Sequence, residues 1–93
     1  NIVNVPPYLS APNFVSNGGS LVYPGTGDYI YGLRGGTTTD FWRYSISGNS
    51  WVAMTSAPAT VYQGGALSYP GTGDYIYGFR GNVFTDFWRY KFK

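Results

Sequence analysis

The 93-residue sequence contains no cysteine and no histidine, and only 11% of its residues are charged. The absence of cysteine excludes disulfide bonds and thiolate metal ligands, and it is compatible with any redox compartment. The absence of histidine removes the commonest metal ligand and the commonest general base of enzymes. We therefore expect a chain without catalytic residues, without a bound metal and without a cofactor.

The sequence also lacks a long apolar run and a concentration of positive charge. No stretch of about 18 apolar residues is available to cross a bilayer, and the N-terminus has no secretion-signal pattern. The formal net charge is +2; arginines and aspartates balance, so the excess comes from Lys91 and Lys93. Neither a membrane nor a nucleic acid is therefore an expected partner.

The residues that are abundant are typical of β-structure. Aromatic residues make up 20% of the chain, and there are 14 glycines. Runs rich in Tyr, Trp, Phe, Val, Ile and Thr alternate with clusters of Gly, Pro, Ser and Asn, which is the usual pattern of strands and turns. Low charge with high aromatic content argues against disorder, and no segment has a sustained helical period. The sequence predicts an all-β fold.

Residues 18–44 and 64–90 are two copies of one motif. They align without a gap at an offset of 46, and 21 of the 27 positions are identical. Such similarity indicates recent duplication or deliberate engineering from one unit. We divide the chain into an N-terminal strand and link at 1–17, a first repeat at 18–63 and a second repeat at 64–93. Because the chain begins with Asn1 instead of Met, we expect that it was processed or excised from something longer.

Turn residues divide each repeat into short strands. In the second repeat we predict strands at Ala66–Tyr69, Asp74–Phe79 and Phe87–Phe92, separated by a Pro-Gly turn and a loop. The first repeat adds a fourth strand at Trp51–Met54, after a tight turn at 47–50. Four antiparallel strands in a repeat of roughly 40–50 residues are typical of a β-propeller blade.

The second repeat ends before the position of its own fourth strand. At the other end of the chain, Val5 stands at the repeat position of Trp51, so residues 1–5 provide a spare fourth strand. In closed propellers the last blade is often completed by a strand from the other terminus, which removes an exposed sheet edge. We therefore expect two four-stranded antiparallel blades per chain, the second completed by an N-terminal strand.

The repeat resembles the kelch repeat. Tyr29-Ile30-Tyr31 leads into the glycine-containing segment 32–35, and six residues separate Tyr44 from Trp51. Asn49 lies two residues before this tryptophan, and Pro58 lies in the link that follows. The glycine doublet of kelch repeats appears here as Gly-x-Arg-Gly, and the second copy ends before its tryptophan. The resemblance otherwise covers essentially the whole chain.

This resemblance implies a ring that the chain completes by assembly. Kelch propellers close with roughly six or seven blades and mostly bind proteins or carbohydrates. Two blades cannot close a ring, so the chain is expected to assemble head to tail with itself. A homotrimer with six blades is the preferred arrangement, and a homotetramer with eight blades is the alternative. The expected function is a non-catalytic, self-assembling scaffold or binding module. The alternative is a carbohydrate-binding, lectin-like propeller with one shallow site per blade.

The charged residues have both a catalytic and a structural interpretation. Paired aspartates could catalyse glycoside hydrolysis. A hydrolase or lyase that uses aspartate and arginine is therefore the third functional hypothesis. The turn at 24–28 could bind phosphate or Ca²⁺, but it lacks the Lys-Ser/Thr of a phosphate loop and the spaced acids of a calcium loop. Because every aspartate recurs at the same place in both repeats, we favour turn formation and pairing with arginine. The predicted structural residues are Asp28, Arg34, Asp40, Arg43, Tyr44, Trp51, Asp74, Arg80, Asp86, Arg89 and Tyr90.

The remaining candidates are aromatic segments and variable loops. Residues 41–44 and 87–90 combine aromatics with arginine, which could stack on sugars or bases. Aromatics on both faces of a strand fit packing between blades better. Differences between the two copies cluster at 36–38 and 82–84, in a loop that lies on the ligand-binding face of kelch propellers. The predicted ligand-binding residues are Thr37, Thr38, Tyr62, Gln63, Val83 and Phe84, with Phe84 the first candidate.

Overall fold

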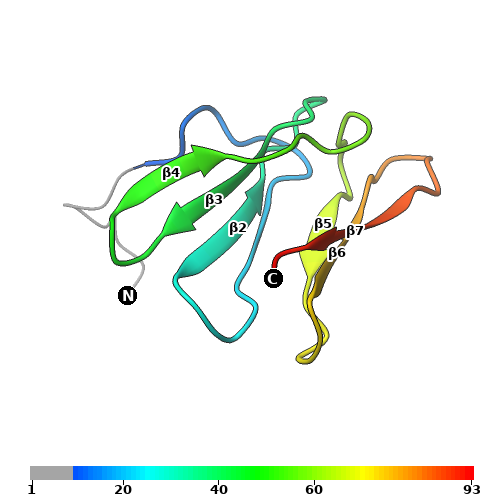
Figure 1. The fold of residues 1–93 in the computed structure, drawn as a ribbon. Coiled ribbons are helices and arrows are strands. Elements are labelled where there is room, and N and C mark those ends of the chain that lie inside the picture. Colours follow the sequence, from blue (N-terminus) through cyan, green and yellow to red (C-terminus); the bar gives the residue numbers. More distant parts are fainter. Residues whose placement is uncertain (1–9) are drawn as a thin grey trace, which may run out of the picture.

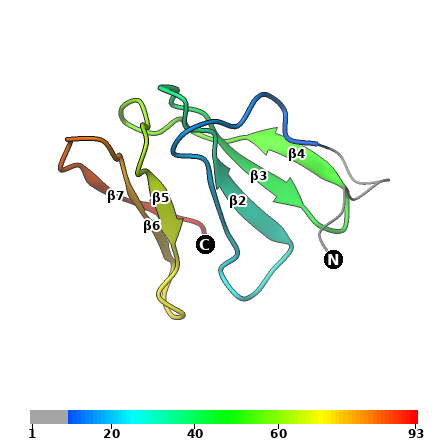
Figure 2. The same ribbon diagram turned by 180° about the vertical axis from the view of Figure 1, so that it is seen from behind.

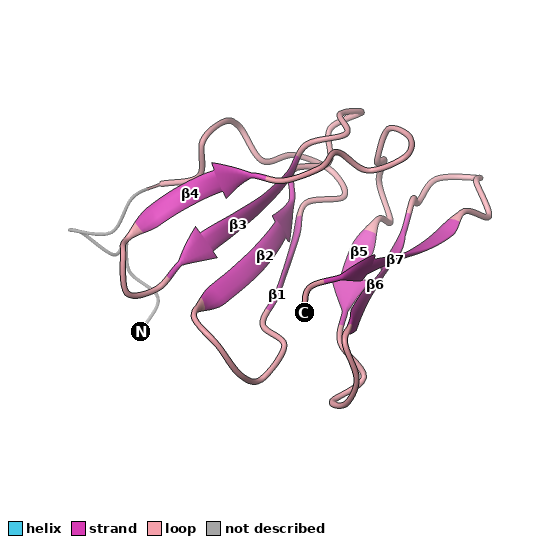
Figure 3. Cartoon of the chain, viewed as in Figure 1, coloured by secondary structure: helices cyan, strands magenta, loops and turns pink. Residues whose placement is uncertain are grey.

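The computed structural model describes residues 10–93, which form two antiparallel β-sheets (Figure 1). The first sheet has the order β1 (Ser20–Val22), β2 (Tyr29–Leu33), β3 (Phe41–Ser45) and β4 (Ser50–Ala53). The second has the order β5 (Ala66–Ser68), β6 (Tyr75–Phe79) and β7 (Phe87–Lys91). The predicted all-β class is confirmed, and none of the described residues is helical (Figure 3). Residues 10–93 therefore contain no helix that could cross a membrane. The predicted N-terminal strand at 1–5 lies outside the described residues.

The two repeats share one strand register. Tyr31 of β2 pairs with Arg43 of β3, and Tyr77 of β6 pairs with Arg89 of β7. Side chains of paired residues point to the same face of an antiparallel sheet, and successive residues alternate between faces. This alternation gives each repeat two faces. Face A carries Tyr29, Tyr31, Leu33, Phe41 and Arg43, or their copies 46 residues later. Face B carries Leu21, Ile30, Trp42 and Tyr44, or their copies.

The hydrophobic core lies between the two sheets, where face A of the first repeat meets face B of the second. The rings of Phe41 and Tyr90 are 4.9 Å apart in an edge-to-face arrangement, and those of Tyr31 and Tyr90 are 5.7 Å apart. Aromatic pairs at these separations add to the stabilisation from apolar burial. Ile76 is only 1% exposed at this junction. Burial also raises the pKa of the Tyr31 phenol, so this group stays neutral within the core.

The link between the sheets crosses the loop of the first repeat before it enters the second. Val61 is completely buried and forms a bridge with Thr38, with a Val61 N to Thr38 O hydrogen bond of 2.8 Å. The next residue, Tyr62, donates its N–H to Arg80 O at 2.9 Å, so the link joins the loops of both repeats. A Cβ on Gly81 would lie 2.4 Å from Gly65 N, which explains why the loop of the second repeat needs glycine at this position.

Both sheets are oriented the same way. Loops 34–40 and 80–86 lie together at one end, with the link between them, and turns 23–28 and 69–74 lie at the opposite end (Figures 1 and 2). We call these the loop end and the turn end. At the inner side of the pair, β1 lies against β5, and Leu67 N donates to Ser20 Oγ at 3.1 Å. Equivalent residues of the two repeats are therefore brought side by side at the loop end.

Candidate functional site

The loop end contains a cavity of about 370 Å³ between the two repeats. Three of the six predicted ligand-binding residues line it, namely Thr37, Tyr62 and Gln63. The cavity is also lined by Ser16, Asn17, Gly36 and Asn82, which the sequence prediction missed. The repeat offset of 46 relates Ser16 to Tyr62, Asn17 to Gln63 and Gly36 to Asn82. Applying that offset to Tyr62 and Gln63 would have identified Ser16 and Asn17, whereas Gly36 and Asn82 correspond only to each other and adjoin the predicted loop residues.

The other three predicted ligand-binding residues do not line this cavity. Thr38 takes part in the bridge to Val61, and its hydroxyl donates to Gly35 O at 2.7 Å. Val83 projects into solvent. Phe84, the first candidate, packs against Tyr62 with the ring centroids 5.4 Å apart. The guanidinium of Arg80 covers the ring of Phe84 at 3.5 Å, so this phenylalanine supports the cavity wall.

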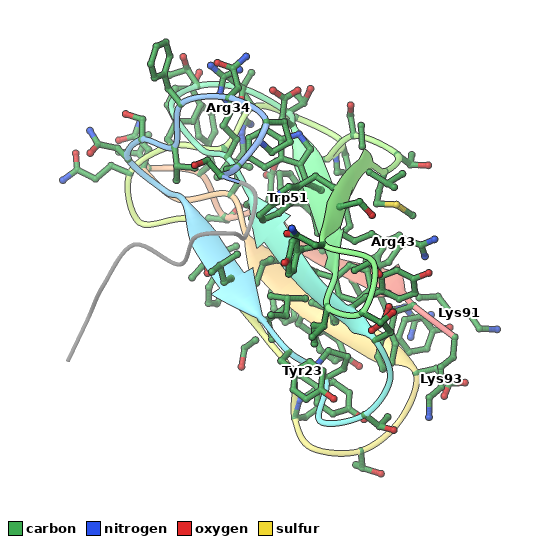
Figure 4. The ribbon with its side chains drawn as sticks, turned by 90° about the vertical axis from the view of Figure 1, so that its left-hand side faces the viewer. Tyr23, Arg34, Arg43, Trp51, Lys91 and Lys93 are labelled. Atoms are coloured by element: carbon green, nitrogen blue, oxygen red, sulfur yellow. The ribbon has the colours of Figure 1, made fainter. Side chains whose placement is uncertain are left out.

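One arginine of each repeat ties a loop to the preceding link. Arg34 donates from Nε to Phe14 O at 2.7 Å and pairs with Asp40 at 3.0 Å. Its copy Arg80 donates to Thr60 O at 2.9 Å and pairs with Asp86 at 3.3 Å. Figure 4 places Arg34 at the loop end, opposite Tyr23 at the turn end. These ion pairs are partly exposed, so their main effect is to position the loops.

The other arginine of each repeat stacks on tyrosine. Arg43 lies 3.9 Å from the ring centroid of Tyr29, and Arg89 lies 3.9 Å from that of Tyr75. Among residues 10–93 neither guanidinium forms an ion pair with an aspartate. The sequence allows either arginine of a repeat to pair with an aspartate. In the structure only the arginine at the start of the loop, Arg34 or Arg80, forms such a pair among residues 10–93.

The Tyr–Trp pair of the kelch resemblance lies on face B of the first repeat. Tyr44 donates its hydroxyl to Asn49 Oδ1 at 2.8 Å, and its ring is 5.1 Å from that of Trp51. The ring of Trp51 also meets that of Trp42 edge to face, with the ring centroids 6.0 Å apart, and Trp42 is only 5% exposed. In the second repeat the corresponding tyrosine, Tyr90, packs across the junction on Phe41 instead.

Asp28 fastens the turn end of the first sheet. Its carboxylate accepts hydrogen bonds from Ser45 Oγ at 2.6 Å, from Ser47 N at 2.8 Å and from Ser47 Oγ at 2.9 Å. The hydrogen bond from Ser45, followed by those from Ser47, holds the pKa of Asp28 below its ordinary value of 3.8. Asp28 is therefore committed to the turn, and the described residues contain no cluster of metal-ligating side chains.

We expect the stability of the Asp28→Asn variant to depend less on pH under acidic conditions than that of the parent. The folded pKa lies below the unfolded one, so the contribution of Asp28 is present above about pH 4 and is lost as the pH falls through the folded pKa. The measurement is the urea midpoint as a function of pH. Asp74→Asn is the matched control, because Lys91 and Lys93 replace the two serines in the second repeat. Identical acid profiles for Asp28→Asn and the parent would contradict the role assigned to this carboxylate.

Apolar side chains are exposed on the two outward faces of the repeat pair. On face A, Phe41 is 5% exposed but its copy Phe87 is 60% exposed, and Leu33 is 4% exposed but its counterpart Phe79 is 55% exposed. On face B, Leu67 is half-buried at the junction, while its copy Leu21 is 65% exposed. Residues 10–93 thus present one copy of each face of the internal junction to solvent.

The described residues thus offer apolar packing surfaces and a polar cavity at the loop end. In comparisons with known proteins, no family model, curated protein or solved structure matches this chain.

Proposed function

We propose that this chain is a non-catalytic, self-assembling β-propeller scaffold. Copies associate head to tail, so that face A of the second repeat packs on face B of the first repeat in the next chain. The contact is heterologous, because two different surfaces meet, and successive rotation closes it into a ring. A homotrimer with six blades is the preferred closed form, and a homotetramer with eight blades is the alternative.

One observation carries this proposal: the faces that meet inside the chain are both repeated on its outside. The internal junction buries Phe41 and Leu33 against Ile76 and Tyr90. Outside, Phe87 and its neighbours repeat the first of these surfaces, including the stacked pair of Tyr77 and Phe87 at 5.7 Å. The stacked pair of Tyr31 and Phe41 at 6.0 Å is its internal equivalent. A second junction can therefore form between chains with the contacts of the first.

Exposure of these faces in a single chain supports the same proposal. Contiguous apolar patches of more than a few hundred Å² are rare on soluble monomers and usually mark interaction sites. The ring centroids of Phe79 and Phe87 are 5.1 Å apart, so these two exposed side chains form one apolar patch on face A of the second repeat. Burying each such aromatic would contribute roughly 1.5–3 kcal/mol to association. The resemblance to kelch repeats favours a ring over an open filament.

The second sheet has an edge that an additional strand could cover. Among the described residues β7 pairs with β6 alone, whereas the equivalent strand β3 lies between β2 and β4. An apolar cavity of about 240 Å³ lies beside Trp88 and Tyr90, on the face where Trp51 covers Trp42 and Tyr44 in the first repeat. We propose that residues 1–5 supply this strand, either to their own chain or to a neighbour.

Native mass spectrometry tests the assembly. The chain mass is 10.2 kDa, so a trimer should appear near 31 kDa and a tetramer near 41 kDa. Because a heterologous contact closes at one number of copies, we expect one dominant species instead of a ladder of masses. A stable species of 10.2 kDa at all accessible concentrations would contradict the proposal.

A further inference from the structure

The apolar cavity of about 240 Å³ lies between the two sheets of a single chain. The residues that line its inner wall include Leu33, Phe41 and Ile76, each of which is at most 5% exposed. Thr55 and Ser56 also line it and are exposed, so the cavity opens to solvent beside the link that follows β4. All of its lining residues belong to one chain, so the cavity does not depend on assembly.

Among residues 10–93 no charged side chain points into this cavity. Arg89 is its one charged lining residue, but strand alternation places the side chain on face A, where the guanidinium stacks on Tyr75 at 3.9 Å. The cavity lies on the opposite face, beside Trp88 and Tyr90. A charged ligand would lose its hydration here without gaining an opposite charge. The cavity therefore suits a neutral ligand.

The first repeat shows which group packs on the same pair of side chains. Trp42 and Tyr44 are the copies of Trp88 and Tyr90, and the indole of Trp51 packs on both of them. Its ring centroid lies 6.0 Å from that of Trp42 and 5.1 Å from that of Tyr44, at separations that are favourable for aromatic pairs. One wall of the cavity thus has the composition of a surface that holds an indole elsewhere in this chain.

The second repeat has no equivalent indole among the described residues. Trp42 is 5% exposed, whereas its copy Trp88 is only partly buried. Val5 stands at the repeat position of Trp51, so the strand proposed above for the edge of β7 brings a smaller, aliphatic side chain. The space that a tryptophan ring fills in the first repeat is therefore available to a ligand in the second.

We propose that this cavity binds a neutral, planar aromatic molecule with two fused rings, such as indole. An apolar cavity of roughly 150 Å³ is sufficient to bind benzene, so a cavity of about 240 Å³ accommodates a larger ring system. A flat ligand can contact the rings of Trp88 and Tyr90 on one side and that of Phe41 on the other. Burial of its apolar surface supplies the binding free energy.

One such site is expected in each chain. On the exposed face A, Phe79 stands at the position of Leu33, and its larger side chain would fill the corresponding space in a junction between chains. On the exposed face B, Trp51 already occupies the indole position. Binding needs only the internal junction, so a monomeric Phe87→Arg chain should bind as well as the parent. This proposal and the assembly proposal can therefore fail separately.

Methyl-resolved NMR during a titration with indole tests the site. The methyl groups of Leu67 and Ile76 line the cavity and should shift in a saturable manner, with a Kd of about 1 mM or tighter. Leu21 and Ile30 are the copies of these residues in the first repeat and provide the internal control, so their methyl groups should shift much less. Benzene has one ring and should bind more weakly than indole.

Two substitutions fill the cavity from different walls. Leu33→Phe introduces the side chain that the chain itself has at Phe79, and Ala57→Leu enlarges a second lining residue. Each should weaken indole binding at least tenfold, while near-UV circular dichroism checks that the fold is retained. Val83→Phe adds a ring at an exposed position outside the cavity and should bind like the parent.

Three results would overturn the inference. They are the absence of a saturable shift at Leu67 and Ile76, equal shifts at Leu21 and Ile30, and parent-like binding by both cavity-filling variants. The first two are measured on the parent protein, so the test remains decisive even where a variant fails to fold.

Discussion

An equimolar mixture of Phe87→Arg and Leu21→Arg chains is expected to form heterodimers of about twice 10.2 kDa, although each variant alone remains a monomer. Phe87 lies on the exposed face A of the second repeat, and Leu21 lies on the exposed face B of the first. Arginine at either position places a charge without a partner in the proposed interface, which is strongly unfavourable. Each variant then retains one functional face.

The result follows from the heterologous character of the contact. The intact face B of the Phe87→Arg chain can pack on the intact face A of the Leu21→Arg chain, and the two altered faces prevent further growth. An interface that joins identical surfaces would behave differently, because either substitution would be present on both sides. The heterodimer therefore reports the direction of assembly as well as its existence.

Native mass spectrometry with one isotopically labelled variant provides the measurement. Thr72→Arg adds the same charge at an exposed position of the turn end and should leave the parent assembly unchanged. Near-UV circular dichroism of each variant checks that the core of the single chain is intact, because both substituted side chains are already exposed in it. Assembled single variants, or a mixture that contains only monomers, would contradict head-to-tail packing.

Local patterns were sufficient to predict the strands. The fourth strand was predicted at Trp51–Met54 and is found at Ser50–Ala53, and the strand predicted at Phe87–Phe92 ends at Lys91. Alternating aromatics set the faces of each strand, and Gly and Pro set the turns, so both signals are contained within a few residues. The division of Phe41 and Trp42 between opposite faces follows from the same alternation.

Contacts between distant segments were less accessible from the sequence. From the sequence, Asp40 could pair with either Arg34 or Arg43. In the folded loop the guanidinium of Arg34 lies 3.0 Å from the Asp40 carboxylate, whereas Arg43 stacks on Tyr29. The cavity at the loop end was half predicted, because Ser16 and Asn17 belong to a link whose residues differ from Tyr62 and Gln63. Conservation between the copies identifies the framework; the cavity is formed mainly by positions at which the copies differ.

The second prediction with a large effect compares two copies of one phenylalanine. Phe41→Ala should lower the free energy of unfolding by about 3–5 kcal/mol, because it removes a buried ring and leaves a cavity. That loss is a large part of the roughly 5–15 kcal/mol that stabilises a typical domain. Phe87→Ala changes the equivalent residue on the exposed face, so its cost depends on whether another chain covers it.

The Leu21→Arg background separates these two cases, because it prevents the proposed assembly. In that background urea unfolding should give Phe87→Ala a cost below about 1 kcal/mol, while Phe41→Ala keeps its full cost. In the assembled parent, where a second junction buries Phe87, the two substitutions should cost similar amounts. A small cost of Phe87→Ala in both backgrounds would mean that no chain covers this face. A large cost in both would mean that Phe87 stabilises the single chain itself, so only a cost that appears with assembly agrees with a junction repeated between chains.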